Sequence, residues 1–217
     1  MYKRDSGTVE VYRASATVLE DYRENFTIEG ARALCKSDRA AYSMVNLYSG
    51  ACIDALCGIR ALFKPYFGAD KDKACRKLYR SLTLRDCYGE VGEIDYSKVV
   101  ARPDIACLTS PCPDFSSGSP NPKGARGDKG GNEFVTIPIT VQKLSPRIVF
   151  IEMVGNVISF PDEVVDVLMG LQDVNNMAVH AAVVTMQQYG DIENCSRLVI
   201  VGIDKALGTW AESYRIP

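Results

Sequence analysis

The chain has 217 residues, of which 47% are hydrophobic and 24% are charged, and its formal net charge is −2 at pH 7. This is enough apolar sequence for one good-sized soluble domain with a core. The small net charge excludes a globally basic nucleic-acid-binding surface, so any such contact must come from a local patch. No apolar run approaches the roughly 18 residues of a membrane span. The opening MYKRDSGTVEVYR also lacks the apolar core of a signal peptide, so we expect an intracellular protein.

Eight cysteines and a single histidine limit the chemistry of the chain. No two cysteines have CxxC spacing, so we expect no metal site. Without an export signal, reduced thiols are favoured over disulfides. His180 lies in the apolar stretch MAVHAAVV, which predicts a packed histidine rather than a member of a catalytic triad.

Short apolar runs alternate with helical patterns from residue 43 onward. The expected helices cover 71–81, 132–143 and the stretch SFPDEVVDVLMGL, where Ser159 and Asp162 have capping-box spacing. This alternation predicts an α/β fold with a mostly parallel sheet and helices on both faces. Residues 1–40 form an N-terminal extension to which the sequence assigns no role, ahead of one domain at 41–217. The expected strands lie in SMVNLY, YFGAD, PDIACLT, PRIVFIEMV, HAAVVTM and SRLVIVGI.

Candidate functional residues stand where these strands end or begin. Ligands of open α/β sheets bind outside the carboxyl ends of the strands. Gly50 follows the first strand, Asp70 the second and Cys112 the third, while Glu152 lies near the end of the fourth. Arg197 opens the last strand. The sequence therefore predicts a thiol, a carboxylate and an acidic ribose-binding candidate on one edge.

Each of these residues also has a structural alternative. Gly50 is either the point where a cofactor passes over the end of the first strand or an ordinary turn glycine. Asp70 is either a ligand of ribose hydroxyls or a solvated acid. Cys112 is a candidate nucleophile or a small buried side chain. Burial would raise the pKa of Glu152 and suit a proton donor, whereas the alternative is a salt bridge with Arg197. The sequence contains neither G-x-G-x-x-G nor G-K-[ST], which favours adenosine and ribose contacts over phosphate contacts.

The stretch TSPCPDFSSGSPNPKGARGDKGG, residues 109–131, predicts a long loop with Cys112 at its start. Loops of this length inside compact domains are uncommon and are usually functional or disordered.

In this order, the motifs resemble those of the cytosine-5 DNA methyltransferase family from about residue 44 to residue 203. VNLYSGACID is similar to the first motif of the family, YFGADKDKACRKLY to the second and YGEVGEI, more loosely, to the third. PDIACLTSPCPDFS and the loop after it look like the fourth, PRIVFIEMVGNV like the sixth and VVTMQQYGDIENCSRLVIVGI like the eighth.

The resemblance implies a Rossmann-like methyltransferase fold, S-adenosylmethionine as cofactor and a flipped-out DNA cytosine as substrate. It implies that Cys112 attacks carbon 6 of the base, that Glu152 protonates nitrogen 3, and that Arg197 binds the base carbonyl or a phosphate. The loop after Cys112 would close over the base, with its glycines as hinges. The implied cofactor-binding residues are Tyr48, Ser49, Gly50, Asp70, Lys71, Glu90 and Pro111, and the implied DNA-binding residues are Ser116, Lys123, Arg126 and Lys129.

Several positions depart from the family pattern. Cys52 replaces the second glycine of the first motif and is expected to narrow the cofactor space. Met153 replaces an asparagine, and Cys195 replaces an arginine. We also expect no separate target-recognition domain. Three interpretations stay open: an active enzyme; a non-catalytic or partner-dependent relative, with a second subunit supplying target recognition; and an unrelated α/β domain.

Overall fold

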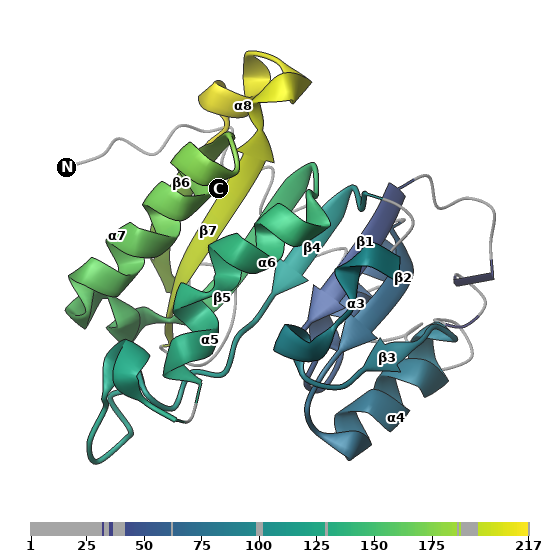
Figure 1. Ribbon diagram of the computed structural model, residues 1–217, viewed down its shortest axis with the longest axis horizontal. Helices are drawn as coiled ribbons and strands as arrows, with labels where there is room; N and C mark the ends of the chain where they lie inside the picture. The colour runs from purple at the N-terminus through teal and green to yellow at the C-terminus, as the bar shows by residue number, and fades with distance from the viewer. Residues whose placement is uncertain are drawn as a thin grey trace.

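The computed structural model describes residues 32, 35, 36, 42–61, 63–98, 102–128, 130–185, 187 and 195–216. Seven strands form one sheet in the order β3-β2-β1-β4-β5-β7-β6 (Figure 1). All six expected strands are confirmed, and β3 was not predicted because two residues show no periodicity. The strands are β1 (Tyr42–Leu47), β2 (Phe63–Ala69), β3 (Cys87–Tyr88), β4 (Ile105–Leu108), β5 (Ile148–Val154), β6 (Met177–Thr185) and β7 (Ser196–Asp204).

Most neighbouring strands run parallel, as predicted, and the exception is β7. It pairs antiparallel with both β5 and β6. Because β7 is reversed, its first residues lie at the edge where β5 ends, and Arg197 pairs in register with Val154. The chain lays strands on both sides of β1, with β2 on one side and β4 on the other. The topological switch point, where ligands of such sheets bind, therefore lies between β1 and β4.

Helices cover both faces of the sheet, as predicted. Residues of α5 (Gly131–Val135), α6 (Ile137–Leu144) and α7 (Pro161–Met169) belong to the main hydrophobic cluster on one face. Residues of α3 (Ile53–Arg60) and α4 (Lys73–Thr83) join a second cluster on the other face. The remaining short elements are the 3-10 turns η1 (Val91–Glu93), η2 (Tyr96–Lys98), η3 (Gly124–Arg126), η4 (Gly155–Ser159) and η7 (Lys205–Leu207), the π-helical turn η5 (Gly170–Val174) and α8 (Trp210–Ser213).

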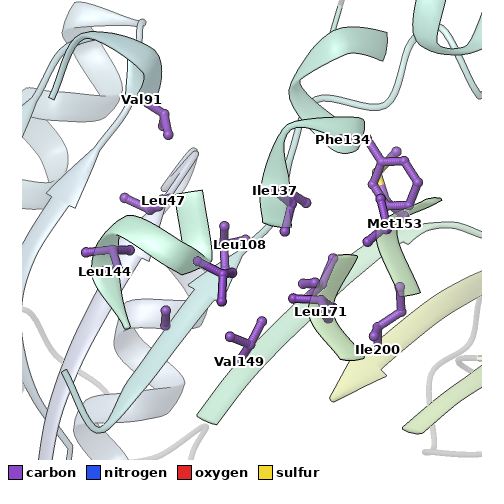
Figure 2. Packing of buried hydrophobic residues seen from close by; sticks show 14 of the residues in the cluster. Leu47, Val91, Leu108, Phe134, Ile137, Leu144, Val149, Met153, Leu171 and Ile200 are labelled. Atoms are coloured by element: carbon purple, nitrogen blue, oxygen red, sulfur yellow. The ribbon is translucent and has the colours of Figure 1, made fainter. Parts of the chain in front are cut away.

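The main core follows from the alternation of side chains along β5. Val149, Ile151 and Met153 are buried on one face, while the residues between them are part-buried. Figure 2 shows Val149 and Met153 in the same cluster as Leu108 of β4 and Ile137 of α6. This packing fixes the ends of β4 and β5 next to each other, and Cys112 and Glu152 lie at those ends.

Some local expectations hold and others fail. Pro161 is the first residue of α7, but Phe160 is the N-cap and no side chain caps the helix. Ser159 Oγ lies 3.4 Å from Asn156 Oδ1 instead, so the predicted capping box with Asp162 is wrong. His180 is packed, as predicted, with Nε2 2.7 Å from the Ala211 carbonyl oxygen.

All eight cysteines are free thiols. Within the described part of the chain, no helix has the length and apolarity needed to cross a membrane. The same residues contain no cluster of three or more His, Cys, Asp or Glu side chains that could bind a metal ion. Most of the N-terminal extension lies outside the described residues.

Candidate active site

A pocket of about 220 Å³ opens at the switch point between β1 and β4. It is lined by Tyr48, Gly50, Asp70, Lys71, Glu90, Val91, Thr109, Pro111 and Glu133. All the predicted cofactor-binding residues except Ser49 are in this lining. Val91, Thr109 and Glu133 were not predicted. Thr109 directly precedes the Ser-Pro-Cys run, and its hydroxyl donates to the Tyr48 carbonyl oxygen at 3.1 Å.

Ser49 does not line the pocket. Its side chain is only 3% exposed, and its Oγ lies 3.9 Å from Cys87 Sγ. Its backbone N–H donates to the Ala69 carbonyl oxygen at 3.0 Å. Ser49 therefore continues the pairing of β1 with β2 beneath the pocket, and its side chain is unavailable to a ligand there.

Asp70 ties the turn after β1 to the end of β2. Its Oδ2 accepts the backbone N–H of Gly50, and its Oδ1 accepts the backbone N–H of Asp72, both at 2.8 Å. Gly50 has a φ of 43°, in the left-handed region that favours glycine. Each carboxylate oxygen can accept a further hydrogen bond. Asp70 can thus order the turn and still receive the hydroxyls of a ribose.

Cys52 does not narrow the pocket, contrary to expectation. Its side chain is fully buried with Met44, Ala55 and Tyr79 on the α3 and α4 side of the sheet. This burial raises the pKa of its thiol to about 12. Cys52 is the N-cap of α3 and has a φ of 64°. Replacing glycine by cysteine at this position therefore costs free energy through the left-handed backbone conformation, not through a clash with the cofactor.

A second hollow of about 650 Å³ adjoins the first and shares Tyr48, Glu90, Val91 and Glu133 with it. Burial, with smaller contributions from Glu133, Tyr96 and Glu90, raises the pKa of Tyr48 far above its ordinary value, so the phenol stays protonated. Lys71 Nζ lies 3.6 Å from Glu133 Oε1, which joins the end of β2 to α5. Together the two hollows form one groove at the switch point, with an acidic wall.

The three predicted catalytic residues meet at the carboxyl edge of β4 and β5. Arg197 Nε lies 2.7 Å from Glu152 Oε1, so the predicted alternative of a salt bridge is realised. Burial raises the pKa of Glu152, and the Arg197 guanidinium opposes that shift. Cys112 is half-buried. Burial and, to a smaller extent, the Glu152 charge raise the pKa of its thiol, while the Arg197 charge lowers it. A thiol, a carboxyl group and a cation are therefore electrostatically coupled at one place.

The two substituted motif residues at this site have defined partners. Arg197 Nη1 donates to Cys195 Sγ at 3.0 Å and to the Ser196 carbonyl oxygen at 3.1 Å. Met153 is buried, and its sulfur accepts the Ser110 hydroxyl at 3.4 Å. Met153 therefore links β5 to the segment that leads into Cys112.

The family follows from a match to most of the chain. A model of C-5 cytosine-specific DNA methylases matches residues 42–214. The chain belongs to this family. A search of curated proteins found no match.

Solved structures of methyltransferases share the fold of this family member. An E. coli protein encoded within a prophage and described as a DNA modification methyltransferase matches with a TM-score of 0.61 and 17% identity, over 77% of this chain and 48% of its own. The Dnmt2 methyltransferase of S. pombe matches with a TM-score of 0.60 and 11% identity, over 81% of this chain and 52% of its own. The chain thus spans about half the length of these proteins, and the likeness supports the Rossmann-like methyltransferase fold.

The loop after Cys112 is ordered rather than structureless over its described residues. Phe115 is fully buried, with ring centroids 5.4 Å from Phe134 and 5.2 Å from Phe160. Asn156 Nδ2 donates to the Phe115 carbonyl oxygen at 2.8 Å. Sequence reasoning missed these residues, although a phenylalanine in an otherwise polar loop is a signal for an internal anchor.

Two of the predicted DNA-binding residues lie on the outer part of this loop. Lys123 and Arg126 are exposed around η3. Ser116 Oγ accepts the backbone N–H of Gly118 at 3.2 Å, so that hydroxyl is partly engaged. Lys129 lies outside the described residues.

Proposed function

We propose that this chain is a DNA (cytosine-5-)-methyltransferase catalytic domain. It transfers a methyl group from S-adenosylmethionine to carbon 5 of a flipped-out cytosine through a covalent adduct with Cys112. The observation that carries the proposal is the coupling of Cys112 to the Glu152–Arg197 pair beside the switch-point groove, in a member of the cytosine-specific family. A DNA substrate also implies an intracellular protein.

The groove suits the proposed cofactor in its donor and acceptor set. Asp70 would accept the ribose hydroxyls and Glu90 the adenine amine. Gly50 leaves open space for the cofactor to approach the backbone, because a Cβ added there would meet only the Tyr48 carbonyl oxygen, at 3.8 Å. Tyr48, Lys71 and Pro111 would complete the wall. S-adenosylmethionine, when bound, would supply an electrophilic methyl group.

The chain's own residues account for the activation of cytosine. The Cys112 thiolate forms a bond to carbon 6, and the Glu152 carboxyl group donates its proton to nitrogen 3. The electron pair then available at carbon 5 would form the new bond to the methyl carbon, while the bond from that carbon to the sulfonium sulfur would break and leave its electron pair on sulfur. A base removes the carbon 5 proton, the bond between carbon 6 and sulfur breaks, and the proton on nitrogen 3 returns to Glu152. Water exclusion by burial favours the protonated acid that the first step requires.

Arg197 is suited to hold the target base. Its Nε pairs with Glu152 and its Nη1 with Cys195, whereas its Nη2 has no hydrogen-bond partner among the described residues. That nitrogen can donate to the carbonyl oxygen of cytosine while the other two fix the guanidinium plane. Arg197 would thereby set both the position of the base and the acidity of Glu152.

Phosphate contacts would come from the loop after Cys112. Lys123 and Arg126, with Ser116 and Lys129, would neutralise or bind phosphates on either side of the target. A chain with a net charge of −2 needs such a local patch to approach DNA.

A second candidate function is binding of cofactor and DNA without turnover by this chain alone. The observation that favours it is the 2.7 Å ion pair, since a carboxylate held by Arg197 is not a proton donor. On this alternative a second subunit would supply target recognition and shift Arg197 away from Glu152.

Incubation of the chain with S-adenosylmethionine and duplex DNA of mixed sequence tests the proposal, with 5-methylcytosine measured by nucleoside mass spectrometry. We expect product with the wild type, none with Cys112→Ser, and about 100-fold less with Glu152→Gln. Binding of both ligands without product would favour the second candidate. Binding of neither would contradict both.

A further inference from the structure

We propose that Asp114 is a positioning residue that anchors the loop after Cys112 and so fixes the placement of the thiol. The inference concerns loop geometry, and only its catalytic consequence rests on the proposed function. Asp114 has no role in the resemblance described above. We call its contacts with Gly124, Gly127 and Gly131 the Asp114 anchor.

Both the backbone and the side chain of Asp114 bind the far end of the loop. Asp114 is only 3% exposed, and its Oδ2 accepts the backbone N–H of Gly131 at 3.1 Å. Its own carbonyl oxygen accepts the backbone N–H of Gly124 at 3.0 Å. A buried carboxylate is costly unless such donors compensate it, so these bonds hold the two ends of the loop together.

Gly127 shows how closely the loop backbone approaches this carboxylate. A Cβ added to Gly127 would lie 1.9 Å from Asp114 Cγ and 2.2 Å from each carboxylate oxygen. The φ of Gly127 is −81°, which any residue adopts. The absence of a side chain at position 127 is therefore required by Asp114, not by the backbone conformation.

The anchor connects directly to Cys112. Phe115 donates its backbone N–H to the Cys112 carbonyl oxygen at 3.0 Å, and its ring is held between Phe134 and Phe160. Gly130 packs against Pro111, the residue before Cys112, since a Cβ at Gly130 would lie 2.6 Å from the Pro111 carbonyl oxygen. The segment that carries Cys112 is thus held on both sides, at Pro111 by Gly130 and at Phe115 by the two neighbouring rings. Of the glycines that the sequence suggested as hinges, Gly124, Gly127, Gly130 and Gly131 are positions of close contact, whereas Gly118 is not.

Gly127→Ala and Asp114→Ala test the anchor from its two sides, with Gly118→Ala as the matched control. A Cβ at Gly118 would meet only Ser116 Oγ, at an ordinary 3.5 Å. Trypsin cleavage after Lys123 and Arg126, followed by intact mass spectrometry well below the unfolding temperature, reports on loop opening. We expect each anchor variant to be cleaved about tenfold faster than wild type and Gly118→Ala to be unchanged.

The double variant distinguishes the anchor from general loosening. If Gly127 is constrained by Asp114 alone, Gly127→Ala should add less than about twofold to cleavage of Asp114→Ala. Asp114→Asn keeps an acceptor oxygen and should restore most of the protection. Unchanged cleavage of Asp114→Ala, or an equal effect of Gly127→Ala in both backgrounds, would overturn the proposal.

The catalytic consequence needs a readout that mere stability does not move. We expect Asp114→Ala to form a covalent adduct with 5-fluorocytosine DNA about tenfold more slowly at saturating DNA, with its Kd for DNA within about twofold of wild type. An equal adduct rate would reduce Asp114 to a structural role and contradict the positioning assignment. If the wild type forms no adduct, the proposed function fails, and the proteolysis and double-variant results still decide whether the anchor exists.

Discussion

The turn after β1 and the loop after β4 border the site, and both contain residues with a left-handed backbone. The two segments differ in which residue types occupy those positions. The turn after β1 has positive φ at Tyr48, Gly50 and Cys52, so two of its three left-handed positions carry side chains. Among the described residues of the loop after β4, the left-handed positions are both glycine, Gly124 and Gly130. In the first turn the side chains have somewhere to go, one into the pocket wall and one into the core. In the second, a Cβ at Gly124 would lie 2.7 Å from the side chains of Glu163 and Phe160, and a Cβ at Gly130 would lie 2.6 Å from Pro111, so neither position has room for a side chain. A departure from a family pattern is thus tolerated or not according to what surrounds the Cβ.

The largest expected effect comes from breaking the backbone contact in the second loop. A Cβ at Gly131 would lie 1.9 Å from the Gly124 carbonyl oxygen, where no flexible side chain can move aside. We expect Gly131→Ala to lower the free energy of unfolding by about 3 kcal/mol, measured by urea denaturation. A loss below about 1 kcal/mol would show that the loop is not held as described, and Gly118→Ala supplies the neutral control.

The two turns also contrast in their thiols. Cys52 is fully buried with a pKa of about 12, whereas Cys112 is half-buried beside Arg197. We expect iodoacetamide to modify Cys112 at least about 100-fold faster than Cys52 in the folded protein, as measured by peptide mass spectrometry. Comparable rates at both positions would contradict the assignment of one thiol to the core.

The charges around Cys112 predict opposite shifts in its titration. Glu152 raises the pKa of Cys112 and Arg197 lowers it. Glu152→Gln should therefore move the pH profile of Cys112 alkylation to lower pH, and Arg197→Met should move it to higher pH. Shifts of the same sign in both variants would mean that the pair acts on the thiol through structure rather than charge.

A smaller effect separates strain from packing at Cys52. Cys52→Gly relieves the left-handed backbone but loses a buried sulfur, whereas Cys52→Ala loses the sulfur and keeps the strain. We expect the glycine variant to be more stable than the alanine variant by about 1 kcal/mol in urea denaturation. The reverse order would mean that the turn carries no conformational cost at this position.

The smallest expected effect lies on the exposed part of the loop. Removing one phosphate contact with Lys123→Ala or Arg126→Ala should reduce the slope of log K for DNA against log salt by about 0.9. Lys98→Ala is a suitable control, because Lys98 lies on η2, outside this loop, and pairs with Asp95. An unchanged slope in both loop variants would remove this loop from the DNA interface.

The strands and the functional edge could be predicted because apolar runs and the residues that follow them are local features. The reversal of β7 could not, since periodicity is the same in either direction. Ser49 and Cys52 were expected at the cofactor because they belong to the right turn. Which way their side chains point depends on φ values and pairing that no pattern encodes. Asp114 was missed because a buried carboxylate in a polar loop is visible only once Gly127 and Gly131 fold back onto it.

Covalent trapping tests the central claim most directly. The chain is mixed with S-adenosylmethionine and duplex DNA carrying 5-fluorocytosine, whose fluorine blocks the final elimination, and adducts that survive denaturation are counted. We expect an adduct mapped to Cys112 that disappears in Cys112→Ser and forms about 100-fold more slowly in Glu152→Gln. No adduct in the wild type, under conditions where it binds both cofactor and DNA, would contradict catalysis by this chain.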